Sequence, residues 1–367
     1  MAASPTAVRG RARPGRVQEP RPLGAPNCRT TRRSGLTLLG FIGFVCAAAA
    51  QRIDLSWPTP NRAWEQGVGI EAWAQPTVSG DPASGLFGCV RSGGTQFHEG
   101  LDLKPVGRDA RGEPTDKIFA ALDGVVRYVS TRAGESNYGR YIVLEHPGMT
   151  PAVYTLYAHL AKIESGVTPG VSVKRGQTIA TLGHSSSGAI PKERAHLHFE
   201  IGLMATTNFA AWYATRKFGS PNEHGLWNGM NLMGLDPQDF LRQWRTRQVD
   251  NFQQYFDALR SVVRVRVVTS RTPDFIQRYP ALLRKPLPVG FVAGWEIECN
   301  ATGLPFAWTP LGPADVAGLR PDTVQIVAVE SAIVRAYHCK SLVKPRGAGY
   351  VPGGDLSTML QQVFGLR

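Results

Sequence analysis

The sequence lacks an apolar run of the length that a transmembrane helix needs: the run at residues 35–50 is shorter than the roughly 18 residues that span a bilayer. It also has no helix-turn-helix and no zinc-finger pattern, so nothing in it indicates nucleic acid as a partner. Acidic residues are scarce at the start, where the first fifty residues hold eight Arg and only Glu19. Removing these +7 charges from the net charge of +13 leaves +6, which is mildly basic and compatible with loose attraction to an anionic polymer.

Residues 1–50 are predicted to be a basic leader and a signal peptide. Residues 1–30 have no apolar periodicity and are expected to be unfolded. Arg32 and Arg33 then precede the apolar run, which ends in the small residues Ala47–Ala50. A basic segment, a short apolar segment and a small-residue cleavage site are typical of a signal peptide. We therefore expect export, cleavage near Ala50 and no stable membrane span afterwards.

The stretch from Arg194 to Glu200 carries two histidines at strand spacing. In a strand, His196 and His198 would point to the same face, with Cα atoms roughly 6.7 Å apart. Leu197 and Phe199 would point to the core. Two imidazoles on one face suggest metal or proton chemistry, but a single His-x-His motif is weak evidence.

A second motif, His98-Glu-Gly-Leu-Asp102, lies about a hundred residues upstream. In a straight strand its ends would be roughly 13 Å apart, whereas zinc ligands lie about 2.0–2.2 Å from one ion. Gly100 tolerates the bulge or kink that would bring them together. With one more imidazole they make three protein ligands, and an open fourth position is typical of a catalytic zinc site.

His98-x-x-x-Asp102 followed by His196-x-His198 resembles the signature of the LytM/lysostaphin-type zinc metallopeptidases, family M23. The resemblance extends from about Gly85 to Leu241. Within this range, the segments that resemble the family in the same order are 85–91, 118–126, 138–146, 157–160, 173–180 and the His-x-His strand.

The resemblance implies that Zn²⁺ is held by His98, Asp102 and His198. It also implies a catalytic role for His196 and His159. We expect His196 to be the general base, because the strand fixes it two positions from a ligand on the same face. His159 would be the electrophilic partner, although the two roles could be exchanged. The spacing of the sequence alone leaves His159 open as an ordinary core histidine.

The segment Asn137-Tyr-Gly139 has the composition of a hairpin turn. The resemblance implies that a loop at this place lines the substrate groove, so Asn137 and Tyr138 are candidate substrate-binding residues. His184, within a Ser- and Gly-rich loop, is a further candidate for substrate contact. Glu200 shares the face of His198, and it either orients that imidazole or belongs to a surface pair.

The predicted fold class is mainly β (α+β). Short β-branched runs between Gly-containing turns in residues 118–201 favour antiparallel sheets, and the resemblance implies a LytM-like domain with an open groove over the sheet. We expect an irregular arm at 51–84, a peptidase domain at 85–248 and a small α+β accessory domain of unknown role at 249–367.

Several local elements are predicted within these parts. Residues 85–99 are expected to form an entry strand, and a helix should begin after Asp236, with Pro237 at its first position. The remaining expectations are a helix at 251–262, a half-exposed strand at 263–268 and a terminal helix at 356–364.

Three cysteines would remain in an exported chain, because Cys28 and Cys46 leave with the leader. We expect Cys299 to pair with Cys339, which leaves Cys89 over. Pairing of Cys89 with either of the other two is the open alternative.

The function that the resemblance implies is that of an exported zinc metalloendopeptidase. Its expected substrates are stem or cross-bridge peptides of peptidoglycan. One alternative is a non-enzymatic regulator of cell-wall hydrolases on the same fold, and the other is a general secreted metalloprotease.

Overall fold

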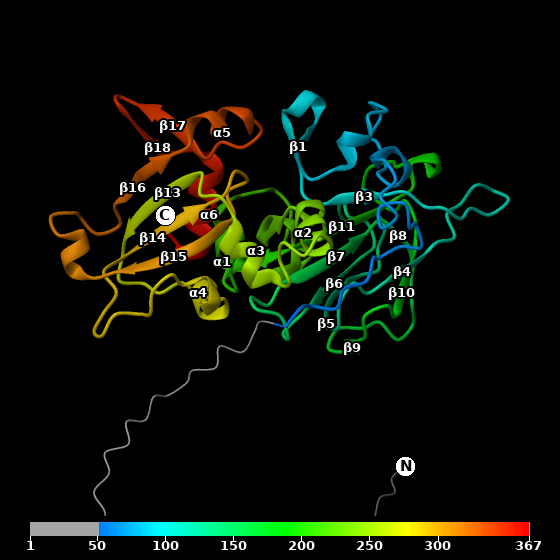
Figure 1. Cartoon of the computed structure of the whole chain (residues 1–367), viewed down its shortest axis with the longest axis horizontal. Coiled ribbons are helices and arrows are strands. Elements are labelled where there is room, and N and C mark those ends of the chain that lie inside the picture. Colours follow the sequence, from blue (N-terminus) through cyan, green and yellow to red (C-terminus); the bar gives the residue numbers. More distant parts are fainter. Residues whose placement is uncertain (1–50, 367) are drawn as a thin grey trace, which may run out of the picture. The chain divides into compact units, whose positions relative to one another are not determined.

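The computed structural model describes residues 51–366 (Figure 1). The predicted leader and signal peptide, including Cys28 and Cys46, lie outside the described residues. Among residues 51–366, no helix combines the length and the apolar character that crossing a bilayer would take. The named strands pair only in antiparallel fashion, and helices are few, which confirms the mainly β fold class.

The first part of the chain builds a hairpin and two sheets, ordered β4-β10-β8 and β12-β11-β7-β6-β5-β9, with β3 beside β11. The strands are β1 (Gly88–Arg91), β2 (Gln96–His98), β3 (Leu101–Leu103), β4 (Lys117–Phe119), β5 (Gly124–Ser130), β6 (Tyr141–Glu145), β7 (Tyr154–Ala158), β8 (Leu160–Ile163), β9 (Ser172–Val173), β10 (Thr178–Leu182), β11 (Leu197–Met204) and β12 (Leu232–Leu235). Strands β7 and β11 are buried along their whole length, as their nearly continuous apolar runs would favour.

Strand β11 joins three segments that are far apart in the sequence. His198 lies opposite Asp102 of β3 on one edge and opposite Ala158 of β7 on the other. The chain changes sheets at Gly100, where a bend is expected. A Cβ atom on Gly100 would lie 2.3 Å from the carbonyl oxygen of Phe199, so only glycine lets this segment approach β11 so closely.

The arm at residues 51–84 packs against these sheets without forming a long element of its own. Its three tryptophans, Trp57, Trp64 and Trp73, are buried. The rings of Trp57 and Trp64 stack with their centroids 4.9 Å apart. The backbone N–H of Gln75 donates to the carbonyl oxygen of Asp102 over 2.8 Å. The arm thus supports the strand that carries one of the candidate ligands.

The C-terminal part has a four-stranded sheet of order β15-β14-β13-β16 and a hairpin β17-β18. These strands are β13 (Val263–Val268), β14 (Gly294–Cys299), β15 (Pro305–Leu311), β16 (Val324–Val329), β17 (Val343–Arg346) and β18 (Gly349–Pro352). The α-helices of the described chain are α1 (Phe209–Thr215), α2 (Pro237–Arg245), α3 (Phe252–Ala258), α4 (Asp274–Arg278), α5 (Ser331–Ala336) and α6 (Gly354–Phe364). One cluster of buried apolar side chains runs from the arm through both parts to α6.

The predictions for α2, β13 and α6 are confirmed. Asp236 caps α2 by accepting a hydrogen bond from the backbone N–H of Asp239 over 3.1 Å. Two other boundaries were wrong. Residues 85–99 form a hairpin rather than one strand, because three successive residues with positive φ at 92–94 reverse the chain. The helix expected at 251–262 ends at Ala258, because Leu259 is extended.

The predicted pairing of Cys299 with Cys339 is wrong. A disulfide joins Cys89 to Cys339, with Cα atoms 5.6 Å apart. Cys299 is a free thiol that is fully buried in β14. Tertiary contacts bring the hairpin that carries Cys89 close to Cys339. The spacing of the cysteines in the sequence does not indicate this proximity.

Candidate metal centre

Three side chains that were predicted as metal ligands meet in the buried interior. Nε2 of His98 lies 3.1 Å from Oδ1 of Asp102, and Nδ1 of His198 lies 3.0 Å from the same oxygen. The two nitrogens are 3.1 Å apart. A tetrahedral ion about 2.0–2.1 Å from each ligand separates its ligand atoms by about 3.3 Å. The triangle of donor atoms therefore fits one small divalent cation.

The second nitrogen of each ligand histidine is held by a hydrogen bond. Nδ1 of His98 donates to the carbonyl oxygen of Leu86 over 2.6 Å. Nε2 of His198 donates to Oε1 of Glu200 over 2.9 Å. These bonds hold one ring proton of each histidine on its outer nitrogen, so a metal ion at the inner nitrogens would replace only a proton bound there.

Glu200 orients the imidazole of His198, and the alternative of a surface pair was wrong. Its carboxylate is buried and also accepts hydrogen bonds from the hydroxyls of Tyr138 over 2.5 Å and of Tyr154 over 2.8 Å. Three donors on one carboxylate compensate for its removal from water. The contact therefore fixes the ring of His198 firmly.

Asp102 is held by Arg91 on the side that faces away from the histidines. Nη2 of Arg91 donates to Oδ2 of Asp102 over 2.5 Å. Burial raises the pKa of Asp102, but the imidazoles of His98 and His196 outweigh burial and hold the pKa well below its usual range. The carboxyl group is therefore ionised at neutral pH, as a metal ligand must be.

The surroundings of His198 favour positive charge. Burial lowers the pKa of His198, but its hydrogen bonds to Asp102 and Glu200 outweigh burial and raise the pKa to about 9. An arrangement that stabilises a proton at this nitrogen also suits a cation among the same donors. The residues present therefore match a divalent metal ion both in geometry and in charge.

The two histidines predicted to be catalytic lie beside the triangle. The rings of His159 and His196 are 4.7 Å apart, and Nε2 of His196 is 3.4 Å from Oδ1 of Asp102. Nδ1 of His196 donates to the carbonyl oxygen of Arg194, and Nδ1 of His159 donates to that of Ser185. The Nε2 lone pair of each ring is therefore available to accept a proton.

Burial lowers the pKa of both of these histidines. For His159 the neighbouring His196 and His198 lower the pKa further, well below its ordinary value, while for His196 the charge of Asp102 partly opposes burial. His159 also has φ at +61°, a conformation that a non-glycine residue adopts at a cost and that is often found at functional sites. Both imidazoles are thus neutral at pH 7, as a general base requires.

The candidate substrate residues occupy different places. The ring of Tyr138 is 5.6 Å from that of His198, beside the metal centre. Oδ1 of Asn137 accepts a hydrogen bond from Ser187 over 2.8 Å. His184 is engaged elsewhere, with the carboxylate of Glu113 as a partner at 3.1 Å.

Two contributors to the site could not be recognised in the sequence. They are the carbonyl oxygen of Leu86 and the guanidinium group of Arg91, both in the segment before the first metal motif. Every residue has a carbonyl oxygen, and the sequence does not show which carboxylate a given arginine contacts. Only the fold of the hairpin brings them to His98 and Asp102.

Comparison with known proteins agrees with this geometry. Residues 96–208 match the model of "Peptidase family M23", a range that contains all five histidine and aspartate positions of the site. The chain is also 31% identical over 147 residues to "Uncharacterized lipoprotein YgeR" of Escherichia coli (strain K12). The aligned residues make up 40% of this chain and 48% of that protein. The chain thus spans about half the length of this curated relative.

Two solved structures are similar to part of this chain. The catalytic domain of the antimicrobial peptidase lysostaphin from Staphylococcus simulans is 23% identical, with 43% of this chain and 87% of that chain covered and a TM-score of 0.26. A putative glycyl-glycine endopeptidase LytM from Ruminococcus gnavus is 26% identical, with coverages of 29% and 39% and a TM-score of 0.24. TM-scores this low support no structural argument, so the assignment depends on the family model. The likeness to peptidase family M23 thus applies to residues 96–208, which carry the candidate metal centre.

Proposed function

We propose that this protein is an exported zinc metalloendopeptidase that hydrolyses peptide bonds in the stem or cross-bridge peptides of peptidoglycan. The observation that carries the proposal is the triangle of donor atoms from His98, Asp102 and His198, with sides of 3.0–3.1 Å. In this proposal residues 85–248 are the peptidase domain and residues 249–367 an accessory domain.

Two nitrogens and one oxygen are a ligand set that zinc accepts, and three protein ligands leave a position for the reactants. A bound zinc ion would lower the pKa of a water molecule and polarise the scissile carbonyl group. The protein's part is to hold the ligands in place. Leu86 and Glu200 fix the two imidazoles, and Arg91 fixes the carboxylate.

His196 is the proposed general base. Its Nδ1 proton is committed to the carbonyl oxygen of Arg194, so Nε2 can take a proton from the attacking water. His159 is the proposed electrophilic partner for the oxyanion of the tetrahedral intermediate. Because the Nδ1 proton of His159 is committed to Ser185, its Nε2 would first take up the proton that the base removes from the attacking water, and only then could it hydrogen-bond the oxyanion. The two roles are therefore linked and could be exchanged.

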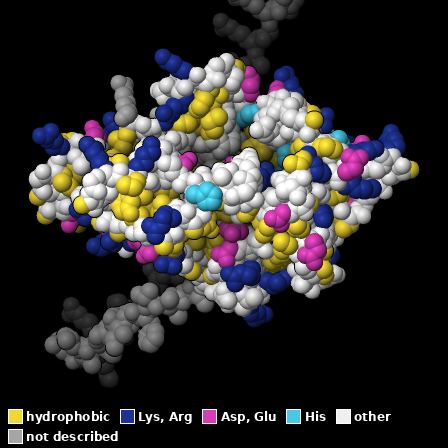
Figure 2. All heavy atoms as spheres, turned by 90° about the horizontal axis from the view of Figure 1, so that it is seen from above, with side chains coloured by type: hydrophobic (Ala, Val, Ile, Leu, Met, Phe, Trp, Pro, Cys, Tyr) yellow, Lys and Arg dark blue, Asp and Glu magenta, His cyan; other side chains and the backbone are white. Residues whose placement is uncertain are grey.

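A peptide of the cell wall suits the charge of the chain. Residues 51–367 carry about +6 of the total +13. On the face drawn in Figure 2, Lys and Arg side chains are scattered, with acidic side chains among them. A scattered charge supports weak attraction to an anionic wall more than tight binding of nucleic acid.

The test is to incubate the zinc-loaded protein with purified cross-linked peptidoglycan and to identify new amino termini by mass spectrometry. We expect cleavage that stops when zinc is chelated and returns when zinc is restored. His198→Ala is the matched inactive variant. Bound zinc without any new amino terminus would favour the non-enzymatic regulator, and faster cleavage of casein than of wall fragments would favour a general protease.

A further inference from the structure

The hairpin at residues 85–99 supports two of the three candidate metal ligands. The carbonyl oxygen of Leu86 accepts the hydrogen bond from Nδ1 of His98. Nη2 of Arg91 donates to Oδ2 of Asp102 over 2.5 Å. Groups that orient metal ligands in this way contribute to the affinity for the ion. The position of the hairpin therefore affects how precisely the ligands are held.

The pairing of its own two strands gives this hairpin little stability. Among the described strands, β1 and β2 pair only with each other. They are four and three residues long, and most of their residues are not buried. An isolated two-stranded hairpin is at best marginally stable in water. The hairpin therefore depends on contacts with another part of the chain.

The C-terminal part provides such contacts through residues 337–340, which directly follow α5. Figure 1 shows the hairpin with β1 beside α5, and the disulfide between Cys89 and Cys339 joins the two. The turn between β1 and β2 also approaches this segment closely, since a Cβ atom on Gly94 would lie 3.2 Å from Cε1 of His338. The segment thus holds β1 covalently and packs against the turn.

The second strand of the hairpin meets the same segment through Lys340. Its Nζ lies 3.8 Å from the ring centre of Phe97, the residue directly before His98. Burial lowers the pKa of Lys340, but the carboxylates of Asp355 and Glu99 oppose burial and favour the charged form. A charged ammonium group over the face of an aromatic ring is attracted to it, more strongly when it is partly desolvated.

The segment at 337–340 is fixed to the core of the C-terminal part. The backbone N–H of Ser341 donates to Oδ2 of Asp355 in the first turn of α6 over 2.6 Å. The side chain of Leu342 is buried. Helix α6 is itself packed into the core through Leu356, Met359, Leu360, Val363 and Phe364. The segment can therefore hold the hairpin in one position.

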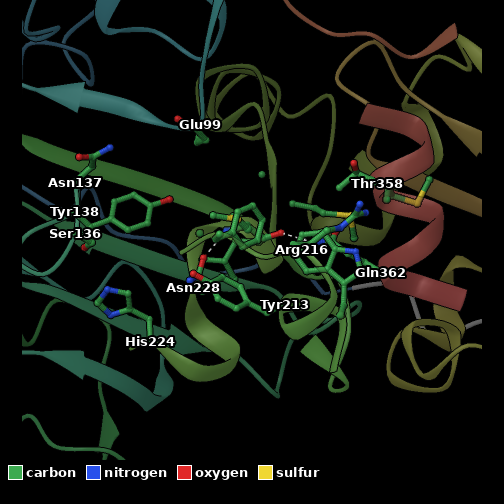
Figure 3. Close-up of a pocket in the computed structure, with 18 of the residues that line it drawn as sticks. Glu99, Ser136, Asn137, Tyr138, Tyr213, Arg216, His224, Asn228, Thr358 and Gln362 are labelled. Atoms are coloured by element: carbon green, nitrogen blue, oxygen red, sulfur yellow. Dashed lines mark hydrogen bonds between the residues drawn. The ribbon is translucent and has the colours of Figure 1, made fainter. Parts of the chain in front are cut away.

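Helix α6 faces the metal centre across a cavity of about 920 Å³. In Figure 3, Tyr138, which lies beside the metal centre, borders the cavity on one side, and Thr358 and Gln362 of α6 border it on the other. Phe97 and Lys340 also line it, so their contact closes part of its wall. The hairpin is thus a bridge of direct contacts from the C-terminal part to the ligands.

We propose that residues 337–340 clamp the hairpin, and that Cys339 and Lys340 thereby raise the affinity of the metal centre for zinc. Both are positioning residues that act through Leu86 and Arg91. The proposal gives the accessory domain a role in the metal centre. It rests on the proposed function in taking zinc to be the ion bound there.

The test measures the affinity of the full chain for zinc by competition with a chromogenic chelator. The double variant Cys89→Ser and Cys339→Ser should bind zinc about tenfold more weakly, at the lower end of the loss that follows removal of a group that orients a metal ligand. Substitution is preferable to chemical reduction, because two free thiols could bind zinc themselves.

Lys340→Met removes the charge over the ring of Phe97 and leaves the disulfide in place. It should lower the affinity for zinc about twofold to fivefold. Lys340→Arg should keep the affinity of the wild type, because a guanidinium group also binds the face of an aromatic ring. Lys344→Met is the matched control, since Lys344 is exposed on β17 of the same part of the chain.

A double-mutant cycle with Arg91→Gln separates the clamp from a general loss of stability. If the clamp acts through the hairpin, Arg91 is already poorly placed once the disulfide is removed. The combined variant should therefore lose less affinity for zinc than the product of the two separate losses.

Thermal unfolding of every zinc-free variant shows whether it is folded, and Lys340→Met provides the test if the double cysteine variant is not. Unchanged affinity for zinc in these variants, or losses that simply multiply in the cycle, would overturn the proposal. Weaker zinc binding in the variants, together with no hydrolysis of peptidoglycan by the wild type, would support the clamp and contradict the proposed function.

Discussion

Nη2 of Arg91 lies 2.5 Å from Oδ2 of Asp102, the carboxylate oxygen that is not shared with the histidines. Oδ1 of the same group faces both His98 and His198. The arginine therefore sets the direction in which Asp102 presents its other oxygen. Arg91 belongs to the hairpin whose Leu86 also orients His98, so one short segment supports two of the three candidate ligands.

Arg91→Gln is expected to lower the affinity for zinc about tenfold to a hundredfold, as the loss of a group that orients a metal ligand typically does. Competition with a chromogenic chelator measures this affinity. Arg127→Gln is the control, since Arg127 pairs with Glu145 at the surface of β5. Equal affinities in the two variants would contradict the role of Arg91.

His98→Ala and His196→Ala should separate binding of the metal from catalysis. His98→Ala is expected to lose zinc, because it removes one of three ligands. His196→Ala should keep zinc but lose about 10²–10⁴-fold in kcat, the usual contribution of a general base. Metal content by atomic absorption and the rate of peptidoglycan hydrolysis report the two effects, and loss of zinc in His196→Ala would refute this division.

Reduction of the disulfide is expected to destabilise the protein. Removing Cys89–Cys339 by the double substitution to Ser should lower the free energy of unfolding by about 2–5 kcal/mol. Denaturant unfolding with and without a reducing agent measures the effect. The reducing agent should not change the double variant further, whereas Cys299→Ala should remain sensitive to it.

His146 should make stability fall in acid. Its ring is buried, with Nδ1 at 2.8 Å from the carbonyl oxygen of Asp123 and Nε2 at 2.8 Å from Thr155. Burial lowers the pKa of His146 from 6.5 to about 4, so between these values the unfolded chain binds a proton that the folded chain does not. The free energy of unfolding should therefore fall as the pH decreases through this window, by up to about 3 kcal/mol.

The measurement for His146 is denaturant unfolding at several pH values between 7 and 4, on the wild type and on His146→Gln. Acidic metal ligands add their own pH dependence to both proteins, so the difference between the two curves is the relevant quantity. The difference should shrink as the pH falls. His338→Gln, at an exposed histidine, should run parallel to the wild type.

Features that depend on neighbouring residues could be predicted from the sequence. Asp236 followed by Pro237 indicates the start of α2, and the alternation at 263–268 indicates a half-exposed strand, because capping and strand periodicity are local properties. The positions of His98, Asp102 and His198 came from spacing and from a family resemblance. The hairpin at 85–99 was missed although the turn is local: Ser92 and the two glycines that follow it all have positive φ, and a Ser-Gly-Gly run is a turn signal.

Features that depend on distant parts of the chain could not be predicted in this way. Arg91 looks like an ordinary solvated arginine in the sequence, and only the fold brings it to Asp102. The pairing of Cys339 with Cys89 rather than with Cys299 likewise depends on the fold. The topology of the chain determines which side chains come into contact, and the amino-acid composition contains no information about these contacts.

The bond between Cys89 and Cys339 also has a consequence for timing. The two residues are 250 positions apart, so the link can close only after the whole segment from Cys89 to Cys339 has been synthesised. Thiols in a reducing cytoplasm remain open, and such a link persists in an oxidising compartment. A chain still inside the cell that makes it would therefore lack the covalent anchor of the segment that steadies His98 and Asp102. With the proposed export, this covalent anchor would form only after the chain has left the cytoplasm.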